Sequence, residues 1–377
     1  MRKEENILKN LFSNFSHIKT DRFFFQVTAV LALAGLIFAF SSSTYQSYAL
    51  TKNFFLLGLK QLTAFLIGFV LLIYLSKVNH KVWYKITWPF SLVILFVMLI
   101  TVCSGLGKTS GGSQRWIDIG FFQFQPAELA KFSVILLISS FLTKYRWSDF
   151  KHYYYFAVIG ILILIILKQP DLGSASILVL LILQLFFIFM WPLWILLPGM
   201  FLAVFIGYLK ALSTPYQLDR IKFWLNPYLE PQGRGYNLIQ AKIAYGLGAL
   251  WGSGLGNSVQ KQGHLPVPHS DFIFAVIAEE TGLLGVTAIL ILYITWILRG
   301  LFLINKVQNK YSRILGTAII IQIGTQAVIN IAVSCGILPV TGVTLPFFSC
   351  GGTSLIVTLG MCGILFNVIS ESETQKQ

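Results

Sequence analysis

One aspartate is the leading candidate for chemistry, because it lies where a basic segment meets a long apolar segment. Asp271 occurs in Pro266-Val-Pro-His-Ser-Asp-Phe-Ile-Phe-Ala-Val-Ile-Ala-Glu-Glu280. Ionisable groups at the mouth of membrane helices are expensive and therefore mark functional sites by default. A carboxylate beside lipid and among cations suits a substrate that has a lipid tail and an anionic head. N-capping of the next helix by Ser270 or Asp271 is the alternative explanation.

Further ionisable groups lie at the starts of other apolar stretches. Glu128 and Lys131 are three residues apart, so they share one face of a helix. They would form a charge pair that lets both enter the bundle, or they would contact a substrate directly. Asp171 follows Lys168-Gln-Pro and opens another apolar stretch. It is either a helix N-cap or part of the site.

Glycine-rich turns provide two candidate anion sites. Ser349-Cys-Gly-Gly-Thr-Ser354 precedes the last apolar segment, and the N–H groups of a helix that starts after Gly-Gly can bind an anion. A plain helix start, however, needs no ligand. Arg115 follows Gly111-Gly-Ser-Gln and precedes Trp116, so it would hold an anion or anchor the chain at the bilayer interface. Further candidates near Asp271 are Arg220, Lys222, Arg234, Lys242 and His269.

The elements that must position these residues are membrane helices. Of the 377 residues, 56% are hydrophobic and 11% are charged, whereas a soluble chain has about 25% charged residues. A helix needs about 20 mainly apolar residues to cross a bilayer. About ten segments qualify, at 24–44, 54–76, 86–103, 125–143, 153–168, 172–190, 193–209, 271–297, 314–334 and 353–370. We therefore predict an all-α polytopic membrane protein, a single domain over residues 1–377, with a long structured outer loop at 210–270.

The basic residues predict the orientation. A net charge of +14 would suggest a nucleic-acid partner in a soluble protein, but in a membrane protein Lys and Arg collect in cytoplasmic loops. With both termini in the cytoplasm, more than half of the Lys and Arg residues fall on that side, including those of the N-terminal arm, 1–22. We expect no nucleic-acid partner. We interpret the first apolar stretch as a retained helix, although Ala-Phe-Ser and Ser-Tyr-Ala would also permit signal-peptide cleavage.

Only the outer loop at 210–270 is basic on the outside, and topology does not require this excess. Its cations are Lys210, Arg220, Lys222, Arg234, Lys242 and Lys261. Five glycines between Gly246 and Gly256 would let the backbone approach another surface closely. Beyond Asp271, Glu279 and Glu280 lie two turns deeper. We expect them to pair with Lys or Arg from another helix, or to be protonated, in a structural role.

Several motifs, in the right order and at the right spacing, resemble the SEDS family of RodA, FtsW and SpoVE proteins. They are Arg115-Trp-Ile-Asp118 with Phe121 to Lys131, Gln169-Pro-Asp-Leu-Gly173, Asn226-Pro227 through Gly235-Tyr236 to Gln240, Gly254-Leu-Gly-Asn257, Ser270 to Glu280, and Leu338-Pro through Ser354. The resemblance covers nearly the whole chain after the N-terminal arm. Three positions differ from the usual pattern: Ser270 replaces Thr, Val267 replaces an acidic residue, and Cys350 replaces Tyr.

The resemblance implies a ten-helix peptidoglycan glycosyltransferase that polymerises lipid II on the outer face of the bacterial cytoplasmic membrane. It implies two partners besides membrane lipid. One is lipid II, the undecaprenyl-pyrophosphate-linked disaccharide pentapeptide, and the other is a class B penicillin-binding protein, a transpeptidase that cross-links the strands. The catalytic carboxylate of the family corresponds to Asp271.

Given that reaction, chemistry assigns a role to each residue. Asp271 would act as general base on the attacking sugar hydroxyl, a contribution of about 10²–10⁴-fold. Preorganised cations would stabilise the leaving pyrophosphate. No cofactor is certain, although a divalent cation, Mg or Mn, would fit, and no protein metal site is expected. A single base predicts inversion at the anomeric carbon. The predicted substrate-binding residues are Arg115, Glu128, Lys131, Asp171, Arg220, Lys222, Arg234, Lys242, His269 and Ser349.

A lipid II flippase is the main alternative, but it requires polar groups through the full depth of the membrane, and most candidates here lie in the outer half. A scaffold that only recruits the transpeptidase would not explain a carboxylate among external cations. Gly254 to Lys261 is typical of the FtsW/SpoVE branch, whereas Gly112 to Gly120 is more similar to RodA. The sequence therefore leans weakly towards a role in division rather than elongation or sporulation.

Overall fold

The computed structural model describes residues 21–103, 107–110, 113–118, 120, 123–145, 152–213 and 215–374. Long helices dominate these residues, because in a bilayer every backbone polar group must be satisfied within the chain. The N-terminal arm, residues 1–22, lies outside the described residues apart from its last two positions. The long helices are α2 (Arg22–Thr51), α3 (Leu56–Ser76), α4 (His80–Cys103), α5 (Pro126–Lys144), α6 (Tyr153–Lys168), α7 (Leu172–Ile188), α8 (Leu193–Ser213), α11 (Ile273–Ile304), α12 (Lys310–Ser334) and α13 (Gly352–Thr374).

Every apolar segment expected from the sequence coincides with one of these helices. Among the described residues, seven helices are long and apolar enough to cross a membrane, namely α2, α3, α4, α5, α11, α12 and α13. Helices α6, α7 and α8 contribute shorter apolar stretches. The prediction of an all-α polytopic membrane protein is confirmed. That all ten segments cross a membrane stays a prediction.

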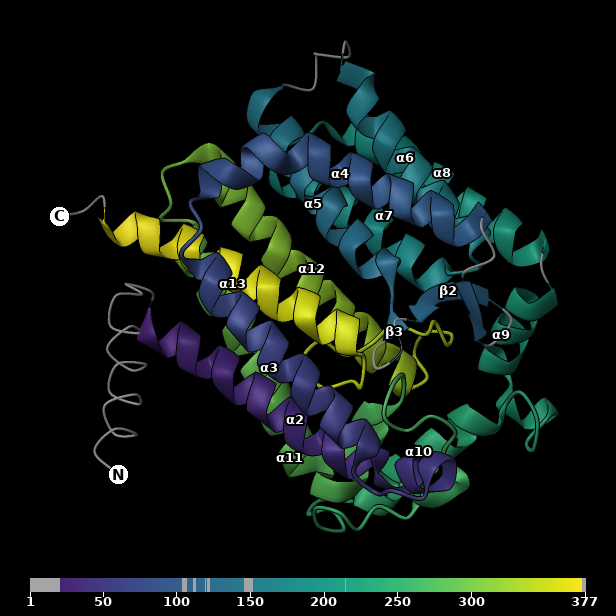
Figure 1. The fold of residues 1–377 in the computed structure, drawn as a ribbon. Coiled ribbons are helices and arrows are strands. Elements are labelled where there is room, and N and C mark those ends of the chain that lie inside the picture. The colour runs from purple at the N-terminus through teal and green to yellow at the C-terminus, as the bar shows by residue number, and fades with distance from the viewer. Residues whose placement is uncertain are drawn as a thin grey trace, which may run out of the picture.

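Three helices form the interior of the bundle. Helix α13 lies at its centre, where it packs against α3, α5 and α12 (Figure 1). In α5, α12 and α13, most side chains are buried within the protein. In α3 and α4 most side chains are only partly buried or exposed, as expected of helices whose outer faces contact lipid tails. Polar groups on the interior helices are therefore shielded from lipid.

A small antiparallel sheet lies between α4 and α5. It consists of β1 (Gly107–Ser110), β2 (Ser113–Asp118) and β3 (Gln123–Phe124), with β2 in the middle. Ile117 pairs with both Gly107 and Phe124. The sequence analysis did not predict this sheet. Its function in the fold is to carry Arg115, which lies on β2, to the start of α7.

The outer loop contains two helices of its own. They are α9 (Pro215–Leu225) and α10 (Tyr236–Gly248), joined by a short turn at Pro227–Leu229 and followed by another at Gln260–His264. Figure 1 shows α10 at the lower end of the bundle, and the turn Gln260–His264 packs against both α10 and α2. Helix α10 packs on α11. The outer loop is thus structured, as predicted, and it rests on the helix that follows Asp271.

Helix α11 is broken at Gly282, which has φ 65° and ψ −168°. A residue with a side chain rarely adopts this conformation. Before the break, the carbonyl of Glu279 accepts a hydrogen bond of 2.9 Å from the N–H of Ser253. After the break, the N–H of Leu283 donates to the carbonyl of Ala249 at 2.9 Å. The backbone of the glycine-rich stretch, Gly246 to Gly256, is therefore hydrogen-bonded to α11 on both sides of the break. This is the close backbone approach that its composition predicts.

Replacement of Gly252 by alanine should destabilise this contact. Gly252 has a φ of 77°, and a Cβ atom there would lie 2.3 Å from the carbonyl oxygen of Glu280. The left-handed backbone alone costs a non-glycine residue about 1–2 kcal/mol, and the clash adds to this. We expect a lower midpoint temperature of thermal unfolding in detergent. The control is Gly246→Ala in α10, where a Cβ meets nothing within 4 Å, so that alanine should leave the midpoint unchanged or raise it.

Glu280 forms a buried ion pair close to the break. Its carboxylate lies 2.6 Å from the ammonium of Lys261 and accepts a hydrogen bond of 2.6 Å from the hydroxyl of Ser41. Lys261 and Glu280 are each at most 5% exposed. Lys261 comes from the outer loop and Ser41 from α2, so this cluster connects three parts of the chain. The expected pairing of Glu280 with a cation is confirmed, although the cation lies on a loop rather than on another membrane helix.

The neighbouring Glu279 has hydrogen-bond donors instead of a cation. Its carboxylate accepts from the backbone N–H of Val259 at 2.7 Å and from that of Gln260 at 3.3 Å. It also accepts from the hydroxyl of Ser258. Glu279 is 1% exposed. Both glutamates thus fasten the outer loop to α11, which agrees with the structural role expected for them.

Candidate active site

The carboxylate of Asp271 does not cap α11. The helix begins at Ile273, its N-cap is Phe272, and no side chain makes a capping hydrogen bond there. Instead, the hydroxyl of Ser270 donates to Asp271 Oδ1 at 2.8 Å. The side chain of Asp271 is half-buried. The capping alternative for Asp271 is therefore wrong, and the carboxylate remains available for other interactions.

Backbone contacts from the segment before α13 hold Asp271 in place. The N–H of Cys350 donates to the carbonyl of His269 at 2.8 Å. The hydroxyl of Ser349 donates to the carbonyl of Ser270 at 2.7 Å and accepts from the N–H of Leu345 at 2.7 Å. Ser349, a predicted substrate-binding residue, is 4% exposed. In this structure its hydroxyl serves to position residues 269–271.

A third support comes from α12, through a residue that the sequence analysis missed. The side-chain amide of Asn330 donates to the carbonyl of Asp271 at 3.1 Å and to that of Val343 at 2.6 Å. Gln322, Gln326 and Asn330 are spaced by four residues along an apolar helix. Polar residues inside membrane helices are rare and usually functional, so this spacing was the signal that could have revealed them.

Asp171 has the capping role that was one of its two alternatives, and its role in substrate binding stays a prediction. One carboxylate oxygen accepts from the N–H of Ser174 at 3.0 Å, and the other accepts from the Ser174 hydroxyl at 2.9 Å. Asp171 is therefore the N-cap of α7. Its Oδ2 also lies 3.7 Å from the guanidinium of Arg115, whose Nε donates to the carbonyl of Gln169 at 3.0 Å. Asp171 and the carbonyl of Gln169 thus hold Arg115 at the start of α7.

Three of the other predicted residues influence the charge state of Asp271. Burial raises the pKa of Asp271 above its ordinary value, and the negative charge of Asp171 acts in the same direction. The hydrogen bond from Ser270 and the positive charges of Arg220 and Arg115 lower that pKa. The charges of Asp171, Arg115 and Arg220 thus all act on Asp271. A raised pKa suits a carboxylate that must accept a proton near neutral pH.

His269 adds no positive charge to this group at neutral pH. Its burial lowers the pKa of the imidazole to about 4. The ring is therefore neutral at neutral pH.

Glu128 and Lys131 form the mutual charge pair that was one of the two alternatives. Their charged groups are 2.8 Å apart, and both side chains are less than 10% exposed. Lys131 also donates to the side-chain oxygen of Gln326 at 2.9 Å. Gln326 in turn donates to the carbonyl of Thr344 at 3.1 Å. This buried network ends at the segment that lies against Asp271, so the pair supports the site from within the bundle.

The other predicted cations of the outer loop are exposed or make contacts elsewhere. Arg234 pairs with Asp219 at the surface and is 60% exposed. Lys222 lies over the ring of Phe223, with its ammonium 5.6 Å from the ring centroid. Lys242 is exposed on α10, and Lys261 forms an ion pair with Glu280. The side chain of Lys210 lies outside the described part of the structure. Arg220 is thus the outer-loop cation that acts on Asp271.

This arrangement can perform acid–base chemistry next to an anionic group. A half-buried carboxylate with a raised pKa can remove a proton from a hydroxyl, and two neighbouring guanidinium groups can bind phosphate oxygens. Within the described residues, no three His, Cys, Asp or Glu side chains form a cluster that could hold a metal ion. The divalent cation allowed by the sequence analysis stays a prediction.

Comparison with known proteins relates this arrangement to one family. Residues 21–374 match the FtsW/RodA/SpoVE family, described as "Cell cycle protein". A probable peptidoglycan glycosyltransferase FtsW from Coxiella burnetii is 38% identical over 79% of this chain and 82% of that protein. Stage V sporulation protein E from Bacillus subtilis is 35% identical over 91% of this chain and 94% of its own length.

Solved structures agree with this result. A chain in a peptidoglycan synthase complex that coordinates polymerization and crosslinking superposes with a TM-score of 0.75 at 26% identity, over 94% of this chain and 98% of that chain. The rod shape determining protein RodA from Thermus thermophilus superposes with a TM-score of 0.69 at 24% identity, over 95% of this chain and 98% of that chain. The second likeness bears on the fold alone.

Proposed function

The chain belongs to the FtsW/RodA/SpoVE family of cell cycle proteins, and from this premise we propose that it polymerises lipid II into glycan strands with Asp271 as the general base. It is a multi-pass membrane protein of the peptidoglycan glycosyltransferase type. We place the reaction on the outer face of the bacterial cytoplasmic membrane, with both termini in the cytoplasm. The observation that supports this assignment best is the half-buried carboxylate of Asp271, which caps no helix and has two arginines nearby.

In the proposed reaction, the 4-hydroxyl of one lipid II attacks the anomeric carbon at the reducing end of the growing strand. A sugar hydroxyl is a poor nucleophile at neutral pH, so proton removal by the Asp271 carboxylate accelerates the attack. A glycosidic bond forms as the bond to the pyrophosphate breaks. Arg115 and Arg220 stabilise the charge that develops on the leaving group. Attack from the opposite side on an α-linked pyrophosphate yields a β-linked product without a covalent enzyme intermediate.

We propose a partner and two further features on the same basis. The partner is a class B penicillin-binding protein, whose transpeptidase activity would cross-link the strands. A divalent cation, Mg or Mn, would assist by neutralising the pyrophosphate. Further predicted contributors to substrate binding, either directly or by supporting the residues around Asp271, are Glu128, Lys131, Asp171, Lys222, Arg234, Lys242, His269 and Ser349.

The experiment that tests the function is a gel assay for glycan strands. The purified protein is incubated with lipid II in the presence of moenomycin, which blocks contaminating class A enzymes. We expect a ladder of polymerised glycan. A preparation that makes no glycan, alone or with its transpeptidase, but moves lipid II across a vesicle membrane would support the alternative function, a lipid II flippase.

Substitution of Arg220 by glutamine tests the electrostatic coupling to the base. The positive charge of Arg220 lowers the pKa of Asp271, so its removal should raise that pKa. Because the base acts in its ionised form, the acid limb of the pH profile of kcat/KM should move to higher pH. The control is Lys222→Gln, two residues away, which removes an exposed charge. An acid limb that stays in place in Arg220→Gln would show that Asp271 is not the titrating base or is not coupled to Arg220.

A further inference from the structure

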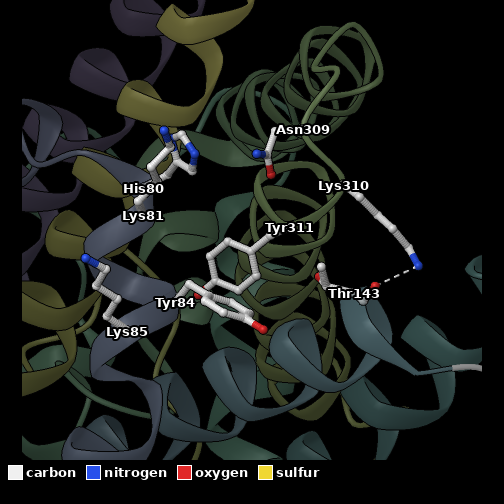
Figure 2. A pocket seen from close by; sticks show the side chains of 8 residues that line it. All are labelled: His80, Lys81, Tyr84, Lys85, Thr143, Asn309, Lys310 and Tyr311. Atoms are coloured by element: carbon white, nitrogen blue, oxygen red, sulfur yellow. Dashed lines mark hydrogen bonds between the residues drawn. The ribbon is translucent and has the colours of Figure 1, made fainter. Parts of the chain in front are cut away.

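A basic cavity lies at the end of the bundle that is opposite to Asp271. Its volume is about 430 Å³. The residues that line it are His80, Lys81, Tyr84 and Lys85 of α4, Thr143 of α5, and Asn309, Lys310 and Tyr311 at the start of α12 (Figure 2). Helix α12 runs from this cavity to the side of Asp271, and its 25 residues span roughly 37 Å. The cavity is therefore separate from the candidate active site.

Three of the residues that line the cavity are lysines. Lys81, Lys85 and Lys310 are all exposed, and no Asp or Glu is among the lining residues. Lys310 donates to the carbonyl of Thr143 at 2.9 Å, and Figure 2 shows the ammonium groups of Lys310 and Lys85 at opposite margins of the cavity. Helix α4 begins at His80 and α12 at Lys310. The positive ends of two helix dipoles thus add to the three lysines.

Aromatic side chains near the cavity place it at the depth of lipid headgroups. The rings of Tyr84 and Tyr311 meet edge-on within the lining, with centroids 5.1 Å apart. One turn beyond Tyr84, Trp88 packs against Tyr154 and Tyr155 at 5.2 and 4.8 Å. Trp and Tyr gather where a membrane protein crosses the interface between lipid tails and water. A ligand in this cavity would therefore come from the headgroup layer.

We propose that this cavity binds the phosphate of an anionic phospholipid headgroup. Basic pockets between membrane helices on the cytoplasmic side commonly bind such headgroups, and the proposed orientation places the cavity on that side. The lysine ammonium groups supply the charge, and the NH2 group of the Asn309 side chain, whose oxygen caps α12, can donate to the phosphate or the headgroup hydroxyls. Phospholipid headgroups and free inorganic phosphate both carry a phosphate anion, so either could bind here, and the experiment must distinguish them. The binding goes beyond the proposed polymerase function and involves neither Asp271 nor lipid II.

Native mass spectrometry of the purified protein tests the proposal. The protein in detergent is titrated separately with phosphatidylglycerol and with phosphatidylcholine, and the fraction that carries one phospholipid is measured. We expect the wild-type protein to prefer phosphatidylglycerol. The triple variant Lys81→Gln/Lys85→Gln/Lys310→Gln should bind it roughly 100-fold more weakly, since each lysine near an anionic lipid contributes about fivefold.

A matched variant separates the cavity from the general charge of the surface. Arg22→Gln/Lys77→Gln/Lys306→Gln removes three exposed charges from the same end of the bundle, but none lines the cavity. It should bind phosphatidylglycerol as the wild type does. Equal loss in both triple variants, or no preference for phosphatidylglycerol in the wild type, would overturn the proposal. Displacement of the lipid by millimolar inorganic phosphate would instead assign the cavity to a soluble anion and would also overturn it.

Discussion

Replacement of Asp271 by asparagine should abolish glycan polymerisation while leaving the fold intact. Asparagine has the same shape and can still accept the hydrogen bond from Ser270, which the wild-type carboxylate receives at 2.8 Å. It cannot take a proton from a sugar hydroxyl at neutral pH. Loss of the general base should lower kcat by about 10²–10⁴-fold. The measurement is the rate of glycan formation from lipid II by the purified variant, with moenomycin present.

The control for this variant is Asp219→Asn. Asp219 lies on α9 and pairs with the exposed Arg234, so its loss removes a carboxylate without touching the proposed base. It should retain most of the wild-type rate. Both variants should elute and unfold as the wild-type protein does. Wild-type polymerisation by the folded Asp271→Asn protein would remove Asp271 from the mechanism and would leave the family assignment unaffected.

Loss of Lys261 should destabilise the protein strongly, because it leaves the carboxylate of Glu280 buried without a cation. Breaking a buried pair in this way costs about 3–5 kcal/mol. The variant Lys261→Met should therefore show a clear drop in the midpoint of thermal unfolding in detergent. The double variant Lys261→Met/Glu280→Leu should recover much of that loss, since two apolar side chains can replace a buried ion pair at little cost.

The outer loop also provides a matched ion pair at the surface. Arg234→Met removes the exposed partner of Asp219, and exposed pairs contribute only about 0–1 kcal/mol. Its unfolding midpoint should therefore remain close to that of the wild type. If Lys261→Met unfolded no earlier than Arg234→Met, the buried cluster of Lys261, Glu280 and Ser41 would not be what fastens the outer loop to the bundle.

The sequence predicted the helices well, because the length and hydropathy of a crossing helix are set by the bilayer. It did not predict the small sheet. Strand β3 has only two residues, and β1 is rich in glycine, serine and threonine, so neither has a periodic apolar pattern that could reveal it. It also did not predict the break in α11. A glycine such as Gly282 is common in membrane helices, and nothing in its local sequence shows that a distant loop binds there.

For the candidate site, the sequence identified the carboxylates better than the cations. Asp271 was found because a carboxylate at the start of an apolar segment is unusual in itself. Whether Lys261 or Arg220 lies near it depends on how the outer loop folds back. The same charge pattern is compatible with either arrangement, and the structure turns Lys261 towards Glu280. Asn330 was missed because its importance comes from two carbonyl groups that the sequence does not place beside it.

The hydrogen bonds across the break in α11 also limit how related proteins can exchange parts. The outer loop and the first turns of α11 share backbone hydrogen bonds on both sides of Gly282. A chimera that receives residues 235–270 from a relative would separate two surfaces that fit each other. A chimera that receives residues 235–284 as a block would carry both the loop and the part of α11 to which the loop is hydrogen-bonded. The unit of recombination in this region is therefore the loop together with the base of the helix.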